Sequence, residues 1–222
     1  MKEDLDVRYI AVEGVIGVGK TSLCQALSKI FNARLILEEI EDNPLIQKFY
    51  GNPQRFAFQA QIFFLLSRYR QLSEKINAQQ SDLFQEKIIA DYMFVKDRIF
   101  ANVNLEENEL NLYNKIADLL EKDILQPDFV IYLQSSVDQI LERIKERARS
   151  YEQGITGDYI EALCEAYNYY FFNFEKAPLL VINVSDVDFV HHPEDLHEIV
   201  TTIKKHRQGT FYFKPFGKRN LR

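Results

Sequence analysis

The feature that most constrains the fold is the segment Gly14–Thr21, which reads GVIGVGKT. Its glycines, lysine and threonine have the spacing G-x-x-x-x-G-K-[ST], the pattern of a phosphate-binding loop between a buried strand and a helix. Both flanks fit this context. The apolar run Tyr9–Val12 precedes the loop, and apolar residues recur with helical spacing over Leu23–Phe31 after it. The sequence therefore predicts a strand, a phosphate-binding turn and a helix in immediate succession.

The residue types in this loop suit the phosphates of a nucleotide. Glycines allow a tight turn whose backbone N–H groups point at phosphate oxygens, and the N-terminus of the following helix attracts the same negative charge. Lys20 can reach the β- and γ-phosphates, and the Thr21 hydroxyl can bind Mg²⁺. We therefore expect ATP and Mg²⁺ as cofactors. The residues assigned to the nucleotide are Gly14, Gly17, Gly19, Lys20, Thr21 and Ser22.

Short apolar runs alternate with helical segments along the rest of the chain, a pattern typical of a parallel sheet covered by helices. A Ser136–Gln139 capping box marks the start of one helix. We expect an α/β, P-loop NTPase-type three-layer fold with a five-stranded parallel sheet and helices on both faces. The predicted strands are Tyr9–Val12, Arg34–Leu37, Lys87–Ala90, Asp128–Leu133 and Leu179–Val184, and the predicted helices include Leu23–Phe31, Pro53–Asn77 and Leu110–Ile124.

Composition narrows the functional classes. The chain has 222 residues with no linker, so residues 1–222 are expected to form one domain, with no regular structure predicted for the basic, aromatic tail at 208–222. A net charge of −6 argues against a nucleic acid polymer as partner. No apolar stretch reaches the roughly 20 residues of a membrane span. The two cysteines, Cys24 and Cys164, lack metal-binding spacing and indicate a reducing compartment. We expect a soluble, cytoplasmic protein without membrane contact.

Charged residues follow the strands where ligands of open α/β sheets bind. Glu38 ends the second predicted strand and Asp91 the third. One carboxylate could accept a proton from an attacking hydroxyl group and another could hold Mg²⁺, although Glu38 could also be a solvated surface charge. A second cluster, Arg143–Arg149, carries four cations into the segment 150–157. These arginines suit a lid, at about 143–157, that closes on phosphates, or simply a solvated helix end.

Four separated motifs together resemble the deoxynucleoside kinase family, in particular its bacterial branch. The resemblance extends from about Tyr9 to Phe189. The motifs are the phosphate-binding loop, Glu38–Pro44 (EEIEDNP), Tyr50–Gln61 (YGNPQRFAFQAQ) running on to Arg68, and Arg147–Ile155 (RARSYEQGI). The resemblance implies transfer of the γ-phosphoryl group of ATP to the 5′-hydroxyl of a small-molecule deoxynucleoside, and a homodimer formed through two long helices.

The resemblance also implies a role for individual residues. Glu38 matches the general base. Lys20, Arg147 and Arg149 match residues that neutralise phosphate charge during the reaction. Asp91 matches a magnesium ligand. Gln61, Arg68, Asp97 and Phe100 match residues that contact the base. Tyr50 and Glu152 match the pair that binds the sugar 3′-hydroxyl. Arg143 matches a further lid arginine, and Asp188 and Phe189 fall near the loop that holds the adenine of ATP.

One position departs from the family pattern. Many members have an arginine directly after the carboxylate of the third strand, where this chain has Tyr92 after Asp91. Lys96, Arg98 or a lid arginine could supply that charge. Two alternatives remain, a nucleoside monophosphate kinase and a catalytically inactive nucleotide-binding relative. Within the preferred interpretation a purine deoxynucleoside is expected, either deoxyguanosine or deoxyadenosine, with deoxycytidine next and thymidine poorest.

Overall fold

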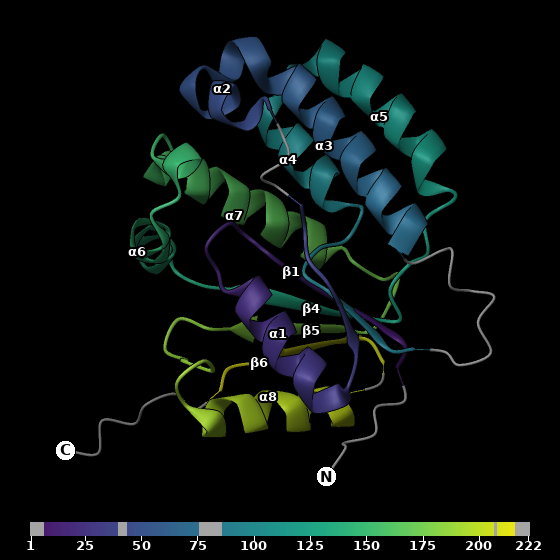
Figure 1. Cartoon of the computed structure of the whole chain (residues 1–222), viewed down its shortest axis with the longest axis vertical. Coiled ribbons are helices and arrows are strands. Elements are labelled where there is room, and N and C mark those ends of the chain that lie inside the picture. The colour runs from purple at the N-terminus through teal and green to yellow at the C-terminus, as the bar shows by residue number, and fades with distance from the viewer. Residues whose placement is uncertain (1–6, 40–43, 76–85, 207, 216–222) are drawn as a thin grey trace.

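The computed structural model describes residues 7–39, 44–75, 86–206 and 208–215. In these residues a parallel sheet lies between two layers of helices (Figure 1), in the strand order β2-β3-β1-β4-β5-β6. The strands are β1 (Tyr9–Gly14), β2 (Arg34–Ile36), β3 (Ile88–Ala90), β4 (Phe129–Gln134), β5 (Leu179–Asn183) and β6 (Thr210–Phe213). The predicted α/β fold with a parallel sheet is confirmed. Its structural neighbours, described below, have the P-loop NTPase-type fold.

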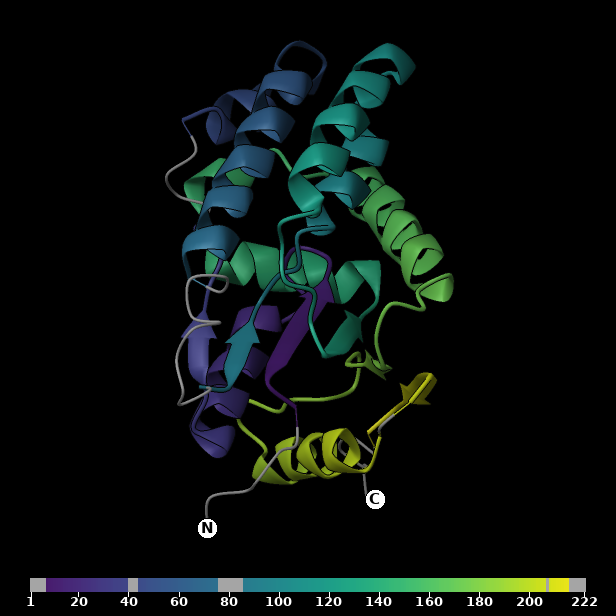
Figure 2. The ribbon, with the colours of Figure 1, turned by 90° about the vertical axis from the view of Figure 1, so that its right-hand side faces the viewer.

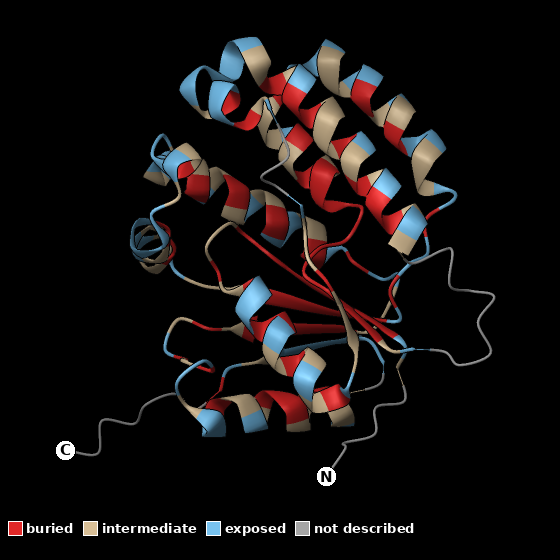
Figure 3. Ribbon diagram, in the orientation of Figure 1, coloured by how far each residue is buried: buried red, intermediate tan, exposed pale blue. Residues whose placement is uncertain are grey.

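The sheet is buried on both faces because its central strands are apolar throughout. In β1 the side chains of Ile10 and Val12 pack on one face, against α1 (Lys20–Phe31) and α8 (Pro193–Lys205), while Tyr9 and Ala11 pack on the other. A continuous apolar run of this kind is typical of a parallel strand covered on both sides. Figure 3 shows the buried residues concentrated in the sheet and on the helix surfaces that face it.

The second helical layer covers the face of the sheet opposite α1 and α8. It consists of α2 (Ile46–Gly51), α3 (Pro53–Lys75), α4 (Lys96–Asn104), α5 (Glu107–Glu121), α6 (Val137–Arg147) and α7 (Gly157–Phe172). Helices α3 and α5 lie beside each other at the end of the molecule farthest from α8 (Figures 1 and 2). Helix α3 begins at Pro53 as predicted, and its predicted last residue, Asn77, lies outside the described residues.

The expected count of five strands was one too low. The sixth strand, β6, pairs in parallel with β5 at the edge of the sheet, in the tail for which no regular structure was predicted. Two of its four residues, Phe211 and Tyr212, are 45% and 62% exposed. The run TFYF is apolar enough for a strand, but it is only four residues long and mostly exposed, and it lies in a basic tail, so its sequence did not distinguish it from an irregular end.

The start of α6 follows the prediction in part. The Ser136 hydroxyl accepts a hydrogen bond from the backbone N–H of Gln139, as an N-cap does. The reciprocal half of the capping box is replaced, because the Gln139 amide donates to the carbonyl oxygen of Ser185. The cap therefore also ties α6 to the loop after β5. Within the described part of the chain, no helix has both the length and the apolar composition needed to cross a membrane.

Candidate active site

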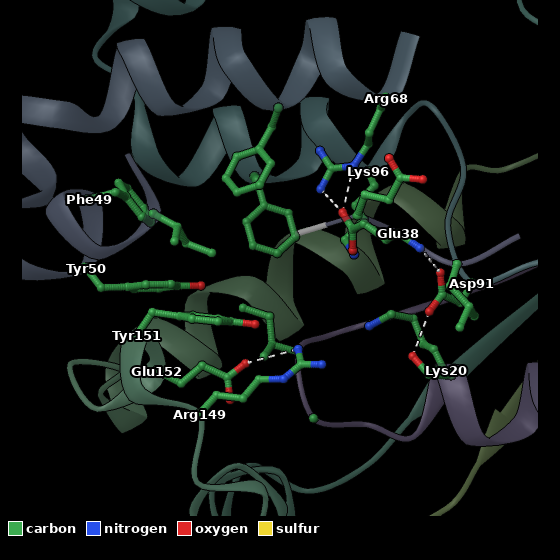
Figure 4. A pocket seen from close by; sticks show the side chains of 18 of the residues that line it. Lys20, Glu38, Phe49, Tyr50, Arg68, Asp91, Lys96, Arg149, Tyr151 and Glu152 are labelled. Atoms are coloured by element: carbon green, nitrogen blue, oxygen red, sulfur yellow. Dashed lines mark hydrogen bonds and ion pairs between the residues drawn. The ribbon is translucent and has the colours of Figure 1, made fainter. Parts of the chain in front are cut away.

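A cavity of about 350 Å³ opens at the carboxyl ends of β1, β2 and β3, between the phosphate-binding loop and the second helical layer (Figure 4). Its volume falls in the range of small-molecule sites. Residues from five predicted groups meet there: the loop, the strand ends, the sugar pair, the base-contacting residues and the lid. The predicted site residues that line it are Gly17, Lys20, Thr21, Glu38, Tyr50, Gln61, Arg68, Asp91, Phe100, Arg147, Arg149 and Glu152.

The phosphate-binding loop has the backbone that its glycines predict. Gly14, Gly17 and Gly19 all have positive φ angles, of 149°, 81° and 108°. At Gly17 a β-carbon would lie 2.9 Å from the Ile144 side chain, so the loop packs directly on α6 and has no room for a larger residue. The buried Lys20 ammonium donates to the carbonyl oxygens of Gly14 (2.8 Å) and Val15 (3.0 Å). The lysine is therefore held inside the loop that would surround the phosphates.

Lys20 is also the site of a perturbed ionisation. Burial and the positive charge of Lys96 lower the pKa of Lys20 to about 8, although the negative charge of Glu13 opposes this shift. A bound phosphate would add negative charge beside it and favour the protonated form. Ser22, by contrast, is exposed on α1 and does not line the cavity.

The two predicted magnesium ligands are in contact. The Thr21 hydroxyl donates to Asp91 Oδ2 at 2.6 Å, and the other oxygen, Oδ1, accepts from the backbone N–H of Glu38 at 2.8 Å. The described residues contain no cluster of three or more His, Cys, Asp or Glu side chains that could enclose a metal. A single carboxylate and a hydroxyl nevertheless fit Mg²⁺, which usually binds one or two protein oxygens together with substrate phosphates.

Glu38 lies between two cations. Arg68 donates from Nε (2.8 Å) and Nη2 to Glu38 Oε1, and the Lys96 ammonium donates to Oε2. Burial would raise the pKa of Glu38, but Arg68 and Lys96 outweigh it and lower the pKa to about 2. The alternative of a solvated surface charge is wrong, because the Glu38 side chain is 6% exposed. Glu38 is therefore ionised and fixed at neutral pH.

The base-contacting residues lie on α3 and α4. Arg68 Nη1 donates to Asp97 Oδ1, so one guanidinium joins Asp97 to Glu38. Burial raises the pKa of Asp97 to about 6 against the attraction of Arg68. Two buried acceptor atoms, Gln61 Oε1 and Asp97 Oδ2, have no hydrogen-bond partner among the described residues. Since buried polar atoms are normally paired, the oxygen of Gln61, which lines the cavity, marks a place where a ligand can donate a hydrogen bond. Asp97 is fully buried and does not itself line the cavity.

The predicted sugar-binding pair comes from two segments that pack closely. Tyr50 lies on α2, with its ring 5.1 Å from Phe49 and 6.4 Å from Tyr159 between centroids. Glu152 is 5% exposed and ends the short 3-10 helix Ser150–Glu152. A β-carbon at Gly154 would lie 2.9 Å from the Tyr50 carbonyl oxygen, so this segment approaches α2 as closely as a glycine permits.

The predicted lid arginines divide into two groups. Arg147 donates to Glu152 at 2.6 Å and 3.2 Å, and Arg149 lies 4.0 Å from the same carboxylate. Both line the cavity. Arg143 instead donates to the backbone carbonyls of Val18 (3.1 Å) and Val184 (3.3 Å), so it braces the loop against the end of β5.

The segment predicted to hold adenine lies beside the phosphate-binding loop. A β-carbon at Gly19 would be 3.2 Å from the Phe189 ring, which is 7% exposed. Asp188 accepts hydrogen bonds from the backbone N–H groups of Val190 (3.2 Å) and His191 (3.0 Å), which fixes the turn.

The missing arginine after Asp91 has a structural explanation. Tyr92 is fully buried, and its hydroxyl donates to Gln71, whose amide donates to the Leu37 carbonyl oxygen at 2.7 Å. The tyrosine thus supports the backbone beside Glu38. Two residues were named as replacements for the charge of the missing arginine. Lys96 contacts Glu38, whereas Arg98 pairs with Asp118 and Glu121 away from the cavity.

Sequence reasoning missed Glu13, the last side chain of β1. It is fully buried and accepts hydrogen bonds from the backbone N–H groups of Met93 (2.6 Å) and Gly14 (3.2 Å) and from the Tyr167 hydroxyl (3.2 Å). Burial raises its pKa, which the charges of Lys96 and Lys20 oppose. A lone carboxylate at the end of an otherwise apolar strand was the signal that could have drawn attention to it.

The phosphate-binding loop and the carboxylates and cations at the strand ends define the class of protein, an ATP-dependent phosphotransferase. A family sequence model described as deoxynucleoside kinase matches residues 10–208. The chain is 37% identical over 204 residues to a deoxyguanosine kinase of Bacillus subtilis, covering 89% of this chain and 96% of that protein. It is 34% identical to a deoxyadenosine kinase of Dictyostelium discoideum, over 90% and 80% of the two chains. The chain belongs to the deoxynucleoside kinase family.

Solved structures agree with this assignment. The structure of deoxyadenosine kinase from M. mycoides with bound dATP matches with a TM-score of 0.74 and 28% sequence identity. The match covers 87% of this chain and 97% of that chain. The same kinase with bound dCTP matches with a TM-score of 0.73.

Proposed function

We propose that this kinase transfers the γ-phosphoryl group of ATP, with Mg²⁺, to the 5′-hydroxyl of a purine deoxynucleoside. The observation that carries the choice of substrate is the pair of unpartnered acceptor oxygens on Gln61 and Asp97. They require a base that offers N–H donors. Guanine offers its ring N–H and an exocyclic amine, adenine and cytosine each offer an exocyclic amine, and thymine offers only its ring N–H. The two oxygens therefore favour guanine and disfavour thymine. Relatives named deoxyguanosine and deoxyadenosine kinase support the same choice.

The residues divide the work of an in-line displacement. Glu38 orients the 5′-hydroxyl and takes its proton as the new bond between oxygen and phosphorus forms and the bond from the γ-phosphorus to ADP breaks. Such transfer depends on positioning and charge neutralisation more than on a strong base, so a Glu38 with a low pKa is suitable. Lys20, Arg147 and Arg149 neutralise the phosphate oxygens. Thr21 and Asp91 would hold Mg²⁺, which would supply positive charge to the phosphates.

Deoxyribose recognition is assigned to Tyr50 and Glu152. Glu152 accepts from Arg147 and lies in the cavity, so one carboxylate contacts both the sugar pocket and the lid. Because these residues suit an uncharged nucleoside, the cavity does not favour the alternative of a nucleoside monophosphate kinase. The intact loop and the Glu38 cluster argue against an inactive relative.

The test is a competition among deoxyguanosine, deoxyadenosine, deoxycytidine and thymidine at equal, subsaturating concentrations with ATP and Mg²⁺. We expect both purines to react fastest and thymidine slowest, because thymine has no exocyclic amine. Asp97→Asn, which replaces one acceptor oxygen with a donor, should reduce the preference for purines. Thymidine reacting faster than both purines would refute the assignment of the base site, and no reaction with any of the four would refute the function.

We propose in addition that the protein is a homodimer formed through α3 and α5. These helices lie side by side and expose three leucines, Leu66, Leu112 and Leu119, at 50%, 51% and 66%. Light scattering at micromolar concentration should give twice the monomer mass of 26.2 kDa, and Leu119→Glu should give the monomer. A monomeric wild-type protein would contradict this proposal. We retain the prediction of a cytoplasmic location, which the free thiols of Cys24 and Cys164 support.

A further inference from the structure

Lys96 is a buried cation that the sequence offered only as one of several replacements for the arginine missing after Asp91. It is the first residue of α4, its side chain is 5% exposed, and it lines the cavity. An ammonium group has three N–H donors, and the one acceptor that Lys96 contacts among the described residues is Glu38 Oε2. Beyond this contact the ammonium faces the Phe100 ring, 6.0 Å from its centroid, so two donors of a buried, charged group have no hydrogen-bond acceptor among the described residues.

Neutralising Glu38 does not by itself require this lysine. Arg68 already donates two hydrogen bonds to Glu38 Oε1 and is fixed at its other side by Asp97. Burying a second cation beside the same carboxylate is costly, because both charges lose their hydration. A purely structural cation would be expected to have its donors fully paired, as those of a core salt bridge are.

The position of Lys96 points instead toward the phosphate. Its charge acts on Lys20 of the phosphate-binding loop, where it contributes to the lowered pKa, and on Glu13 beneath that loop. Figure 4 shows Lys96 beside Glu38 in the cavity that Lys20 and Asp91 also line. The ammonium therefore contacts the residue assigned as general base and lies close enough to the phosphate-binding loop to act on its charges.

We propose that Lys96 is a catalytic residue that contacts both the general base and the transferring phosphoryl group. In the empty cavity it holds Glu38 Oε2. With both substrates bound, it directs a free N–H donor to a γ-phosphoryl oxygen, and Glu38 accepts the 5′-hydroxyl proton as the oxygen–phosphorus bond forms and ADP departs. The inference rests on the function proposed above. It goes beyond that function by assigning to Lys96 part of the charge neutralisation.

The experiment compares Lys96→Met, Lys96→Arg and the matched control Arg98→Met. Arg98 is a cation on the same helix whose partners, Asp118 and Glu121, lie away from the cavity. For each protein kcat and KM are measured with ATP and the best deoxynucleoside, and the Kd of that nucleoside is measured by calorimetry without ATP. We expect Lys96→Met to lower kcat by about 10²–10³, the size of losing one transition-state donor, with less than about a tenfold change in Kd. Lys96→Arg should regain part of kcat, and Arg98→Met should keep it.

The outcomes separate this inference from the proposed function. Wild-type protein that phosphorylates no deoxynucleoside refutes the function and this inference with it. If the wild type is active, either of two results refutes the inference alone. In the first, the kcat of Lys96→Met stays within about threefold of the wild-type value. In the second, its loss of kcat is matched by an equal rise in Kd. If circular dichroism shows that Lys96→Met is unfolded, Lys96→Gln replaces it, since glutamine can still donate to Glu38. A wild-type kcat in that variant overturns the role of the charge.

Discussion

The cavity contains two groups of cations that differ in burial. Arg68 and Lys96, on α3 and α4, have side chains 8% and 5% exposed and hold Glu38 from both sides. Arg147 and Arg149, at the end of α6 and just beyond it, are each 35% exposed and share one carboxylate, Glu152. A buried cation fixes its partner because neither charge can be left unpaired. A half-exposed one can exchange partners at little cost because water solvates it.

The difference in burial suits the two groups of cations to different roles. The buried pair fixes the group that must be aligned with the 5′-hydroxyl before the reaction, which is the kind of preorganisation that lowers a barrier. The lid arginines can leave Glu152 for the phosphates of ATP and return.

The largest effect is expected at Lys20, the third buried cation of the cavity. Lys20→Ala should reduce kcat by at least about 10²–10³, because a donor to the phosphates is lost from a site shielded from water. Folding should persist, since Lys20 contacts loop carbonyls and not the apolar core. Steady-state kinetics and thermal unfolding measure both. Lys29→Ala, an exposed lysine on the same helix, serves as the control. Near-normal turnover in Lys20→Ala would remove the assigned ATP site.

Glu38→Gln removes the carboxylate that the buried cations Arg68 and Lys96 hold, and its effect is measured as the free energy of unfolding. Because the pKa of Glu38 falls from 4.5 to about 2 in the folded protein, its ionised form stabilises the fold above pH 4.5, and this contribution is lost as pH falls from 4.5 toward 2. The variant should be less stable than wild type by about 3 kcal/mol at pH 7, and the difference should shrink across that window. Urea unfolding at pH 7 and pH 3.5 measures it. Glu39→Gln, at the half-exposed pair with Lys75, should show no such difference.

Arg149→Ala tests the exposed group. We expect kcat/KM for ATP to fall about tenfold, the effect of roughly 1.4 kcal/mol, with unchanged thermal stability because a half-exposed ion pair contributes little. Lys145→Ala is the matched control, an exposed cation of α6 outside the cavity. A clear loss of stability in Arg149→Ala would show that the lid arginines are structural and would abolish the contrast between the two groups.

The smallest effect is expected at Tyr50, where an uncharged part of the site meets the sugar. Wild type should prefer deoxyguanosine over guanosine in kcat/KM, because in the assigned sugar site Tyr50 would crowd a ribose 2′-hydroxyl. Tyr50→Phe should lower kcat/KM for deoxyguanosine several-fold, the loss of about one hydrogen bond. Equal kcat/KM values for the two nucleosides in the wild type would contradict the assigned sugar site.

Local patterns in the sequence predicted much of this arrangement. The loop Gly14–Thr21, the helix start at Pro53 and the N-cap at Ser136 each depend on residues close in sequence, and each is present in the structure. The carboxylates Glu38 and Asp91 were expected at one edge because parallel strands end there, and the backbone N–H of Glu38 donates to Asp91 Oδ1.

What escaped prediction depends on partners far apart in the chain. Lys96 was one of several candidates for the missing charge, and nothing near it in sequence singled it out as the one that contacts Glu38. Glu13 gave no sign of accepting from Tyr167. From the sequence alone, Tyr92 in place of the family arginine indicated only the loss of a positive charge. In space Tyr92 supports Leu37 through Gln71, while a cation from α4 reaches Glu38. Strand β6 was missed for a different reason, its exposure at the edge.

The register of β1 has a consequence for how the chain folds during synthesis. The strand that supports the phosphate-binding loop is made first, yet its neighbours are made much later: Tyr9 pairs with Ile88, and Ile10 with Phe129. Contacts between such distant segments form slowly. The loop therefore cannot acquire its packed shape until β4 has left the ribosome, and the apolar β1 stays exposed until then. A nascent chain that ends before Gln134 should be unable to bind nucleotide and prone to aggregate.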